Sequence, residues 1–370
     1  MRDLAPDAGL GHRFVTSPGA HLLALKDRAA LFCARRQQLF ALNDTARLIW
    51  DSLSGGESLA EATDRLERLG LSPAEAEGYV LSAAEAWSRD GFLVPTTAMA
   101  RLGQPPEAER WLAVDGVHFH LSLCGVIDIG ALDAVFGHLA APPAPGVSLA
   151  LVEDEGRHLL FVDGVSRGWT DADGAAPALK AAITELYADT IAEGFLTHGA
   201  LLQARGRTLF LTGEPGAGKT TLTLALAAAG FAYGGDDIVR IGRDGLAVAA
   251  PFAAAAKSGA WDLLASRMPD LDQTRTHQRA DGQAVRYLLP ATLRPLAPAP
   301  LDLILLLRRQ AGAAPALEPV HPLDALVVIL DSAFSRKGAA EGQTLQALAA
   351  RLETAACFTF TYDELDAAVA

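Results

Sequence analysis

The chain has 370 residues, of which 50% are hydrophobic and 20% charged, and its 44 acidic residues outnumber its 31 basic ones to give a net charge of −13. This composition excludes a disordered or fibrous protein, and the acidity argues against a nucleic-acid partner bound mainly through its phosphates. The length allows two or three domains, each with its own buried core.

The cysteines and the apolar runs predict the cellular compartment. Cys33, Cys124 and Cys357 are far apart and form no C-x-x-C pair, so we expect reduced, buried thiols and not a disulfide or zinc framework. Residues 1–7 lack the apolar core of a signal peptide, and no apolar run approaches membrane-spanning length. We therefore predict a cytoplasmic, soluble protein with no membrane partner.

Residues 1–95 are predicted to form the first domain. Three β-prone runs come first, at 21–25, 30–33 and 38–42. Three helices follow, and each has a residue suited to cap its start: Asn43, Ser58 in Ser58-x-x-Glu61, and Ser72 in Ser72-x-x-Glu75. Gly91 is expected to end the last helix. Three strands and three short helices predict a small α+β, winged-helix-like domain.

The rest of the chain predicts a linker and a larger domain. Gly103 and the pair Pro105-Pro106 interrupt all periodicity, so we expect a linker over 96–109. Residues 110–200 predict a β-rich lead-in, with a helix over 179–193 near its end. Beyond residue 200 strands alternate with helical segments, which predicts an α/β layer architecture over the remainder of the domain 110–370.

A complete G-x-x-x-x-G-K-[ST] pattern is present in this larger domain. Its residues are Gly213, Glu214, Pro215, Gly216, Ala217, Gly218, Lys219, Thr220 and Thr221. An apolar strand at 208–212 precedes the pattern and an Ala- and Leu-rich helix at 222–229 follows it, which is the setting that a phosphate-binding loop needs. We expect Lys219 to reach the β- and γ-phosphates of ATP and Thr220 to bind Mg²⁺. A glycine-rich turn without a ligand is the alternative.

Two segments compete to supply the carboxylates of such a site. Residues 326–331 resemble a Walker B strand that ends in Asp331, but Pro322 and apolar residues at i, i+3, i+4 and i+7 favour an amphipathic helix there. The other segment holds the pair Asp236-Asp237 after two glycines. Adjacent carboxylates repel each other, so a buried pair needs a nearby cation, whereas a surface turn is the alternative.

The order of His198-Gly199, the loop and Asp236-Asp237 resembles the catalytic core of the HPr kinase/phosphorylase family, in particular its relatives in peptide-maturation gene sets. The resemblance spans 110–370 and implies a P-loop kinase core of the HPr kinase/PEP carboxykinase type. It implies that His198 lies beside the transferred phosphate, that Asp236 is the base toward a substrate serine, and that Asp237 assists at the metal. Lys257 resembles a lysine that contacts nucleotide or acceptor. The glycine-rich phosphorylase signature is not recognisable, so HPr itself is not implied as substrate.

Residues 42–50, Leu53 and the pair Gly55-Gly56, followed by the two capped helices, resemble the PqqD family of leader-peptide-binding domains. The resemblance implies that an extended precursor segment pairs with a strand edge within 21–42, beside a helix within 72–90. A winged-helix unit used for DNA binding or dimerisation is the alternative, and the acidic charge disfavours DNA.

Together these patterns predict an ATP- and Mg²⁺-dependent kinase that phosphorylates a serine or threonine in the core of a ribosomally made precursor peptide, of the lasso-peptide type, whose leader binds the N-terminal domain. Catalytic roles are expected for His198, Lys219, Asp236 and Asp237. Two other functions fit the same sequence: a nucleotide-gated peptide-binding chaperone or ATPase, and a small-molecule kinase. The sequence leaves the oligomeric state open, with a homo-oligomer as one option.

Overall fold

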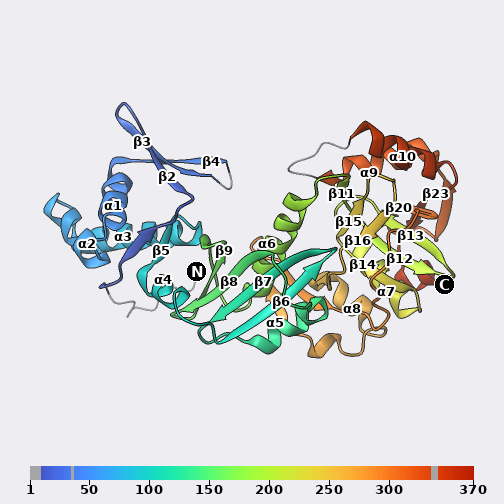
Figure 1. Cartoon of the computed structure of the whole chain (residues 1–370), viewed down its shortest axis with the longest axis horizontal. Coiled ribbons are helices and arrows are strands. Elements are labelled where there is room, and N and C mark those ends of the chain that lie inside the picture. Colours follow the sequence, from blue (N-terminus) through green and yellow to red (C-terminus); the bar gives the residue numbers. More distant parts are fainter. Residues whose placement is uncertain (1–9, 35–36, 335–340) are drawn as a thin grey trace. The chain divides into compact units, whose positions relative to one another are not determined.

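The computed structural model describes residues 10–34, 37–334 and 341–370 (Figure 1). The chain folds into two compact units, and each has buried hydrophobic clusters of its own. Unit 1 comprises Met1–Trp111, Phe119–Asp128 and Pro143–Ala175, and unit 2 comprises Leu112–His118, Ile129–Pro142 and Ala176–Ala370.

The first part of unit 1 is a small sheet with three helices. The elements are β1 (Phe14–Thr16), β2 (Ala20–Leu25), β3 (Arg28–Cys33), β4 (Gln38–Leu42), α1 (Asp44–Ser54), α2 (Leu59–Arg68), α3 (Pro73–Arg89) and β5 (Leu93–Pro95). Strands β2, β3 and β4 form an antiparallel sheet in chain order, so β2 and β4 are its two edges. β1 pairs with β5. The three predicted strands and three predicted helices are confirmed.

Local signals explain the helix starts. The Asn43 side chain accepts a hydrogen bond from the Ala46 N–H (2.8 Å), which satisfies one of the free donors at the start of α1. Ser58 and Ser72 both form the predicted capping boxes. The helices then bury one face each against β3 and against one another, and the rings of Trp50 and Trp87 meet edge to face with centroids 5.3 Å apart.

The segment 96–109 differs from the predicted linker. It begins with α4 (Thr96–Leu102), and β6 (Ala108–Val114) starts before its end. Ala98 of α4 is fully buried in a cluster with Val94, Ala150 and Val152. Neither unit begins or ends within 96–109, because the chain on both sides of this helix belongs to unit 1. The proline and glycine signals therefore mark a turn after a packed helix and not a domain boundary.

A five-stranded sheet follows, in the order β10-β9-β8-β7-β6. Its further strands and the neighbouring helices are β7 (Val117–Cys124), α5 (Ile129–Phe136), β8 (Val147–Asp154), β9 (Arg157–Val162), β10 (Val165–Thr170) and α6 (Ala175–Thr190). Most β8 and β9 side chains are buried. The expected β-rich lead-in and the helix at its end are both present, and the helix starts a few residues earlier than predicted.

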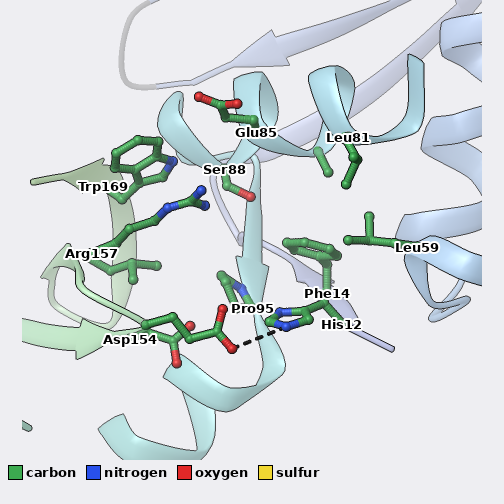
Figure 2. A pocket seen from close by; sticks show the side chains of 13 residues that line it. His12, Phe14, Leu59, Leu81, Glu85, Ser88, Pro95, Asp154, Arg157 and Trp169 are labelled. Atoms are coloured by element: carbon green, nitrogen blue, oxygen red, sulfur yellow. Dashed lines mark ion pairs between the residues drawn. The ribbon is translucent and has the colours of Figure 1, made fainter. Parts of the chain in front are cut away.

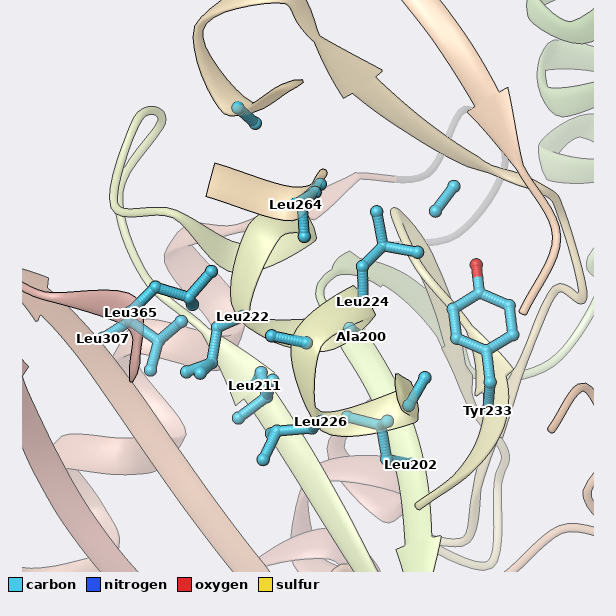
Figure 3. Packing of buried hydrophobic residues seen from close by; sticks show 14 of the residues in the cluster. Ala200, Leu202, Leu211, Leu222, Leu224, Leu226, Tyr233, Leu264, Leu307 and Leu365 are labelled. Carbon is cyan, nitrogen blue, oxygen red and sulfur yellow. The ribbon is translucent and has the colours of Figure 1, made fainter. Parts of the chain in front are cut away.

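The core of unit 2 is a six-stranded sheet in the order β14-β12-β13-β20-β23-β21. Its strands are β12 (Ala200–Ala204), β13 (Arg207–Thr212), β14 (Ala232–Gly235), β20 (Leu303–Arg309), β21 (Ala316–Pro319) and β23 (Ala356–Tyr362). β13, β20 and β23 are parallel, whereas the outer strands pair antiparallel, so the sheet is mixed. Helix α7 (Lys219–Ala228) packs Leu222, Leu224 and Leu226 into the same cluster as Leu202 and Leu211 of the sheet (Figure 3).

Two smaller sheets and several helices complete unit 2. The first sheet has the order β16-β15-β11-β22 and the second β17-β19-β18. The bounds are β11 (Phe195–His198), β15 (Ile238–Ile241), β16 (Ala247–Ala249), β17 (Ala254–Lys257), α8 (Trp261–Leu264), β18 (Thr276–Gln278), β19 (Ala284–Leu288), α9 (Pro322–Asp331), β22 (Ala333–Phe334), α10 (Gly342–Leu352) and α11 (Leu365–Val369). In the described ranges, every helix is too short or too polar to cross a membrane.

Asp331 lies at the end of a helix and not at the end of a strand. His321 caps α9, since its Nδ1 accepts the Leu323 N–H (3.1 Å), and Pro322 occupies the first turn. Ala325 and Ile329 face the core, whereas Asp331 is exposed. The helical alternative to a Walker B strand is therefore confirmed.

Candidate functional site

The glycine-rich loop connects β13 to the start of α7, as the sequence predicts. Gly218 is the N-cap of α7 with φ of 86°, a left-handed conformation that favours glycine. A Cβ at Gly218 would also overlap the hydroxyl of Tyr362 at the end of β23. That hydroxyl donates to the Ala217 carbonyl (3.0 Å), so the loop is supported by a core strand from behind.

Lys219 is the first residue of α7 and turns back over the loop. Its Nζ donates to the carbonyls of Gly213 (2.7 Å) and Glu214 (3.1 Å). Burial lowers the pKa of Lys219, while Asp236 and Asp237 oppose that effect and Lys257, at the end of β17, adds to it. The ammonium group thus lies at the start of a helix, where backbone N–H groups also favour an anion.

Asp236 lies against the first turn of α7. The Thr220 hydroxyl donates to its Oδ2 (2.7 Å), and Asp236 is only 4% exposed, which rules out a simple surface turn at this residue. Burial raises the pKa of Asp236 to about 6; the bond from Thr220 opposes this rise and the neighbouring Asp237 adds to it. A threonine hydroxyl next to a carboxylate is a set of oxygen donors that suits Mg²⁺.

This donor pair fits the predicted Mg²⁺ but would not hold it alone. In the described ranges no three or more His, Cys, Asp and Glu side chains gather as a metal centre. Mg²⁺ in nucleotide enzymes is commonly held by one or two carboxylates together with substrate phosphates. Thr220 and Asp236 are therefore the residues that could hold such an ion.

Asp237 has different partners from Asp236. Its Oδ2 accepts a hydrogen bond from Lys180 Nζ (2.7 Å), and its Oδ1 lies 3.7 Å from His198 Nδ1. Burial works against ionisation of Asp237, but Lys180 and then His198 outweigh it and hold its pKa below the usual range. The Asp237 side chain is still 45% exposed, so an ionised carboxylate faces solvent beside a buried one.

Strand pairing places His198 next to Asp237. β11 runs antiparallel to β15 with His198 opposite Ile238, the residue after Asp237. The His198 ring stacks on Phe334 of β22 with centroids 4.4 Å apart. The hydrogen bond to Asp237 raises the pKa of His198 against the effect of burial. The fold thus brings the separate sequence motifs together, so that His198, Lys219, Asp236 and Asp237 form one cluster.

The position after His198 has room only for a glycine. A Cβ there would overlap the ring of Phe210, which is fully buried in β13. The Gly199 N–H also donates to the Asp237 carbonyl (3.3 Å). We expect Gly199→Ala to destabilise unit 2 by about 1–3 kcal/mol, the usual cost of overpacking a rigid core. Urea unfolding would measure this, with Gly259→Ala as control, because a Cβ at Gly259 meets no atom within 4 Å.

Sequence reasoning missed Lys180. It lies on α6, 57 residues before Asp237, and no motif surrounds it. The only signal in the sequence is a lysine within a helix whose neighbours Leu179, Ala182 and Ile183 are apolar and buried. Lys257, the other lysine singled out by resemblance, is exposed at the end of β17.

Sequence reasoning also missed a pocket in unit 1 (Figure 2). Residues from α2, α3, β1, β9 and β10 line it, among them Phe14, Leu81, Ser88, Arg157 and Trp169. The Arg157 guanidinium lies over the Trp169 ring, 4.5 Å from its centroid. The Ser88 hydroxyl is buried and has no hydrogen-bond partner among the residues that the structure describes. The pocket thus borders the helix that the PqqD resemblance places beside a bound leader.

Comparison with known proteins bears on unit 1. Residues 28–93 match the family model described as Coenzyme PQQ synthesis protein D (PqqD). The chain carries a PqqD domain. The match covers β3, β4 and helices α1 to α3, and it supports recognition of a ribosomally made precursor peptide by the N-terminal domain. Among curated proteins, none matches the chain.

Proposed function

We propose that this protein is an ATP-dependent kinase that phosphorylates a serine or threonine of a precursor peptide held by its PqqD domain. The observation that carries the proposal is the division of Asp236 and Asp237 between two environments beside the glycine-rich loop. Asp236 is buried on the Thr220 hydroxyl, whereas Asp237 is exposed, ionised and in contact with His198. A kinase needs one carboxylate on the metal side and another on the acceptor side.

The residues can be assigned to steps. Lys219 and the N–H groups at the start of α7 bind and orient the phosphates of ATP. Thr220 and Asp236 would hold Mg²⁺, which when bound would supply neutralisation of the negative charge on the phosphates. Asp237 accepts the proton of the acceptor hydroxyl as the new O–P bond forms and the bond to the leaving ADP breaks. His198 contacts Asp237 on the exposed side and orients its carboxylate.

This assignment reverses the roles expected from the sequence, where Asp236 was the base and Asp237 assisted at the metal. The reason is geometric. Asp236 is 4% exposed and bonded to Thr220, so an acceptor hydroxyl has no access to it, while Asp237 is open to solvent. In the usual arrangement of phosphate-loop enzymes the loop Ser or Thr and one Asp lie together at the metal.

The PqqD domain supports a precursor peptide as the substrate class. An extended peptide can add a strand to an exposed sheet edge, and β4 is such an edge, with Leu39 63% exposed on it. Binding of the leader raises the local concentration of the tethered core to the millimolar range, so a weak acceptor site suffices. The experiment that tests the whole proposal is incubation with radiolabelled ATP and a leader-bearing peptide. Retention of label on the peptide supports a kinase, whereas release of all label as phosphate supports the ATPase alternative.

Leader recognition can be tested at the two edges of the β2-β3-β4 sheet. We expect Leu39→Pro on β4 to weaken leader binding at least tenfold, because proline disrupts pairing along the strand. Leu23→Pro on β2 is the matched control, since Leu23 is 44% exposed on the opposite edge. Binding would be measured by fluorescence anisotropy of a labelled leader, and folding by circular dichroism. Equal weakening by both substitutions in folded proteins would exclude β4 as the pairing edge.

A further inference from the structure

Lys180 is a buried lysine with no role in the steps proposed above. The whole residue is 8% exposed, and it lies on α6 among buried apolar side chains. Removal of an ammonium group from water is costly unless a charge partner compensates for it. A lysine at this position is therefore expected to lower stability unless its ammonium group makes a compensating contact.

The contact is directed at one oxygen of one carboxylate. Lys180 Nζ donates to Asp237 Oδ2 at 2.7 Å and lies over the ring of Phe252, 5.1 Å from its centroid. The Lys180 side chain is 11% exposed and that of Asp237 is 45% exposed. The lysine thus holds the carboxylate from the protein side and leaves its other side open to solvent.

The backbone of Asp237 is held separately from its carboxylate. Asp237 has φ of 91°, a conformation that side-chain-bearing residues rarely adopt. Its carbonyl accepts the N–H of Gly199 (3.3 Å) and lies 3.2 Å from His198 Nδ1, so the main chain is fixed by β11. Those main-chain contacts do not fix the carboxylate; Lys180 holds its Oδ2 at 2.7 Å, and His198 Nδ1 lies 3.7 Å from its Oδ1.

We propose that Lys180 is a positioning residue for phosphoryl transfer: by binding Oδ2 of Asp237 it presents Oδ1, the oxygen beside His198, to the acceptor hydroxyl. This inference rests on the proposed function. Lys180 touches neither nucleotide nor acceptor in this scheme and acts only through Asp237. Its removal should therefore affect turnover and leave nucleotide binding in place.

The test uses steady-state kinetics of the full chain on a leader-bearing acceptor peptide. We expect Lys180→Met to lower kcat about 10²-fold, the scale of a small misplacement of a reacting group, with the KM for Mg·ATP changed by less than about twofold. Lys180→Arg, which keeps the charge, should recover part of that loss. Arg286→Met is the matched control, because Arg286 is also a largely buried cation of unit 2, 16% exposed and paired with Asp272. It should lower stability without lowering kcat.

A double-mutant cycle separates positioning from a structural role. In an Asp237→Asn background, Lys180→Met should lower kcat by less than about threefold, because a residue that acts through Asp237 has nothing left to position. The positioning role would be overturned if the effects of the two substitutions on kcat were fully additive, or if Lys180→Met kept the kcat of the wild type. Phosphoryl transfer by the unmodified protein would still support the kinase in either case. No transfer by the wild type would overturn both. If Lys180→Met does not fold, the same comparison is made with Lys180→Gln, which removes the charge; wild-type kcat in that variant overturns the role, and a reduced kcat at unchanged KM supports it.

Discussion

Lys219→Ala is expected to reduce phosphoryl transfer by about 10²–10³-fold or more, because it removes the cation aimed at the phosphates. The Lys219 ammonium bonds only to carbonyls of its own loop, Gly213 and Glu214, among the contacts that the structure describes. Its loss therefore leaves the core packing of α7 unchanged. Transfer of label from ATP to a leader-bearing peptide would measure the effect on activity.

Nucleotide binding provides an independent readout of the same substitution. Mg·ATP should raise the melting temperature of the wild type by several degrees, because a ligand that binds only the folded state stabilises it. The shift should be much smaller for Lys219→Ala. Lys26→Ala, a lysine in unit 1 outside the loop, should behave as the wild type. A well-folded wild type that binds no Mg·ATP by calorimetry would end both the kinase and the ATPase interpretations.

Features set by residues close in sequence were predictable. Helix α1 starts where Asn43 caps it, and the loop from Gly213 lies between a strand and a helix because both neighbours have clear local patterns. The helical state of the segment that ends in Asp331 followed from Pro322 and the apolar spacing in the same way. In each case the pattern that predicts the element lies within or next to that element in the sequence.

Features set by distant contacts were not predictable. The sequence predicts a linker where helix α4 lies, because the strong signals there are the glycine and prolines that follow it, whereas burial of Ala98 against β8 depends on the tertiary fold. Lys180 reaches Asp237 across 57 residues with no motif to link them. The sequence assigns roles to Asp236 and Asp237 only through the family resemblance, and nothing in it indicates that one carboxylate is buried while its neighbour is exposed.

The aspartate pair gives the sharpest test of the assignment. We expect Asp237→Asn to lower kcat for transfer by about 10²–10⁴-fold with nucleotide affinity kept, because the substitution removes the proton acceptor and preserves volume. Asp236→Asn should instead raise the Mg²⁺ concentration needed for half-maximal activity, because it weakens the oxygen pair formed with Thr220. Steady-state kinetics across a Mg²⁺ titration would measure both effects in one series.

Asp331→Asn is the control for this series, because Asp331 is exposed at the end of α9 and should change neither kcat nor the Mg²⁺ requirement. If Asp236→Asn abolished transfer at every Mg²⁺ concentration while Asp237→Asn shifted only the Mg²⁺ requirement, the roles expected from the sequence would hold. Control of turnover by Asp331 would instead indicate a conventional Walker B ATPase. If Asp237→Asn lost transfer to the peptide but hydrolysed ATP at an unchanged rate, this carboxylate would lie on the acceptor side. The reason is that attack by water does not require the base that deprotonates the hydroxyl of the peptide core.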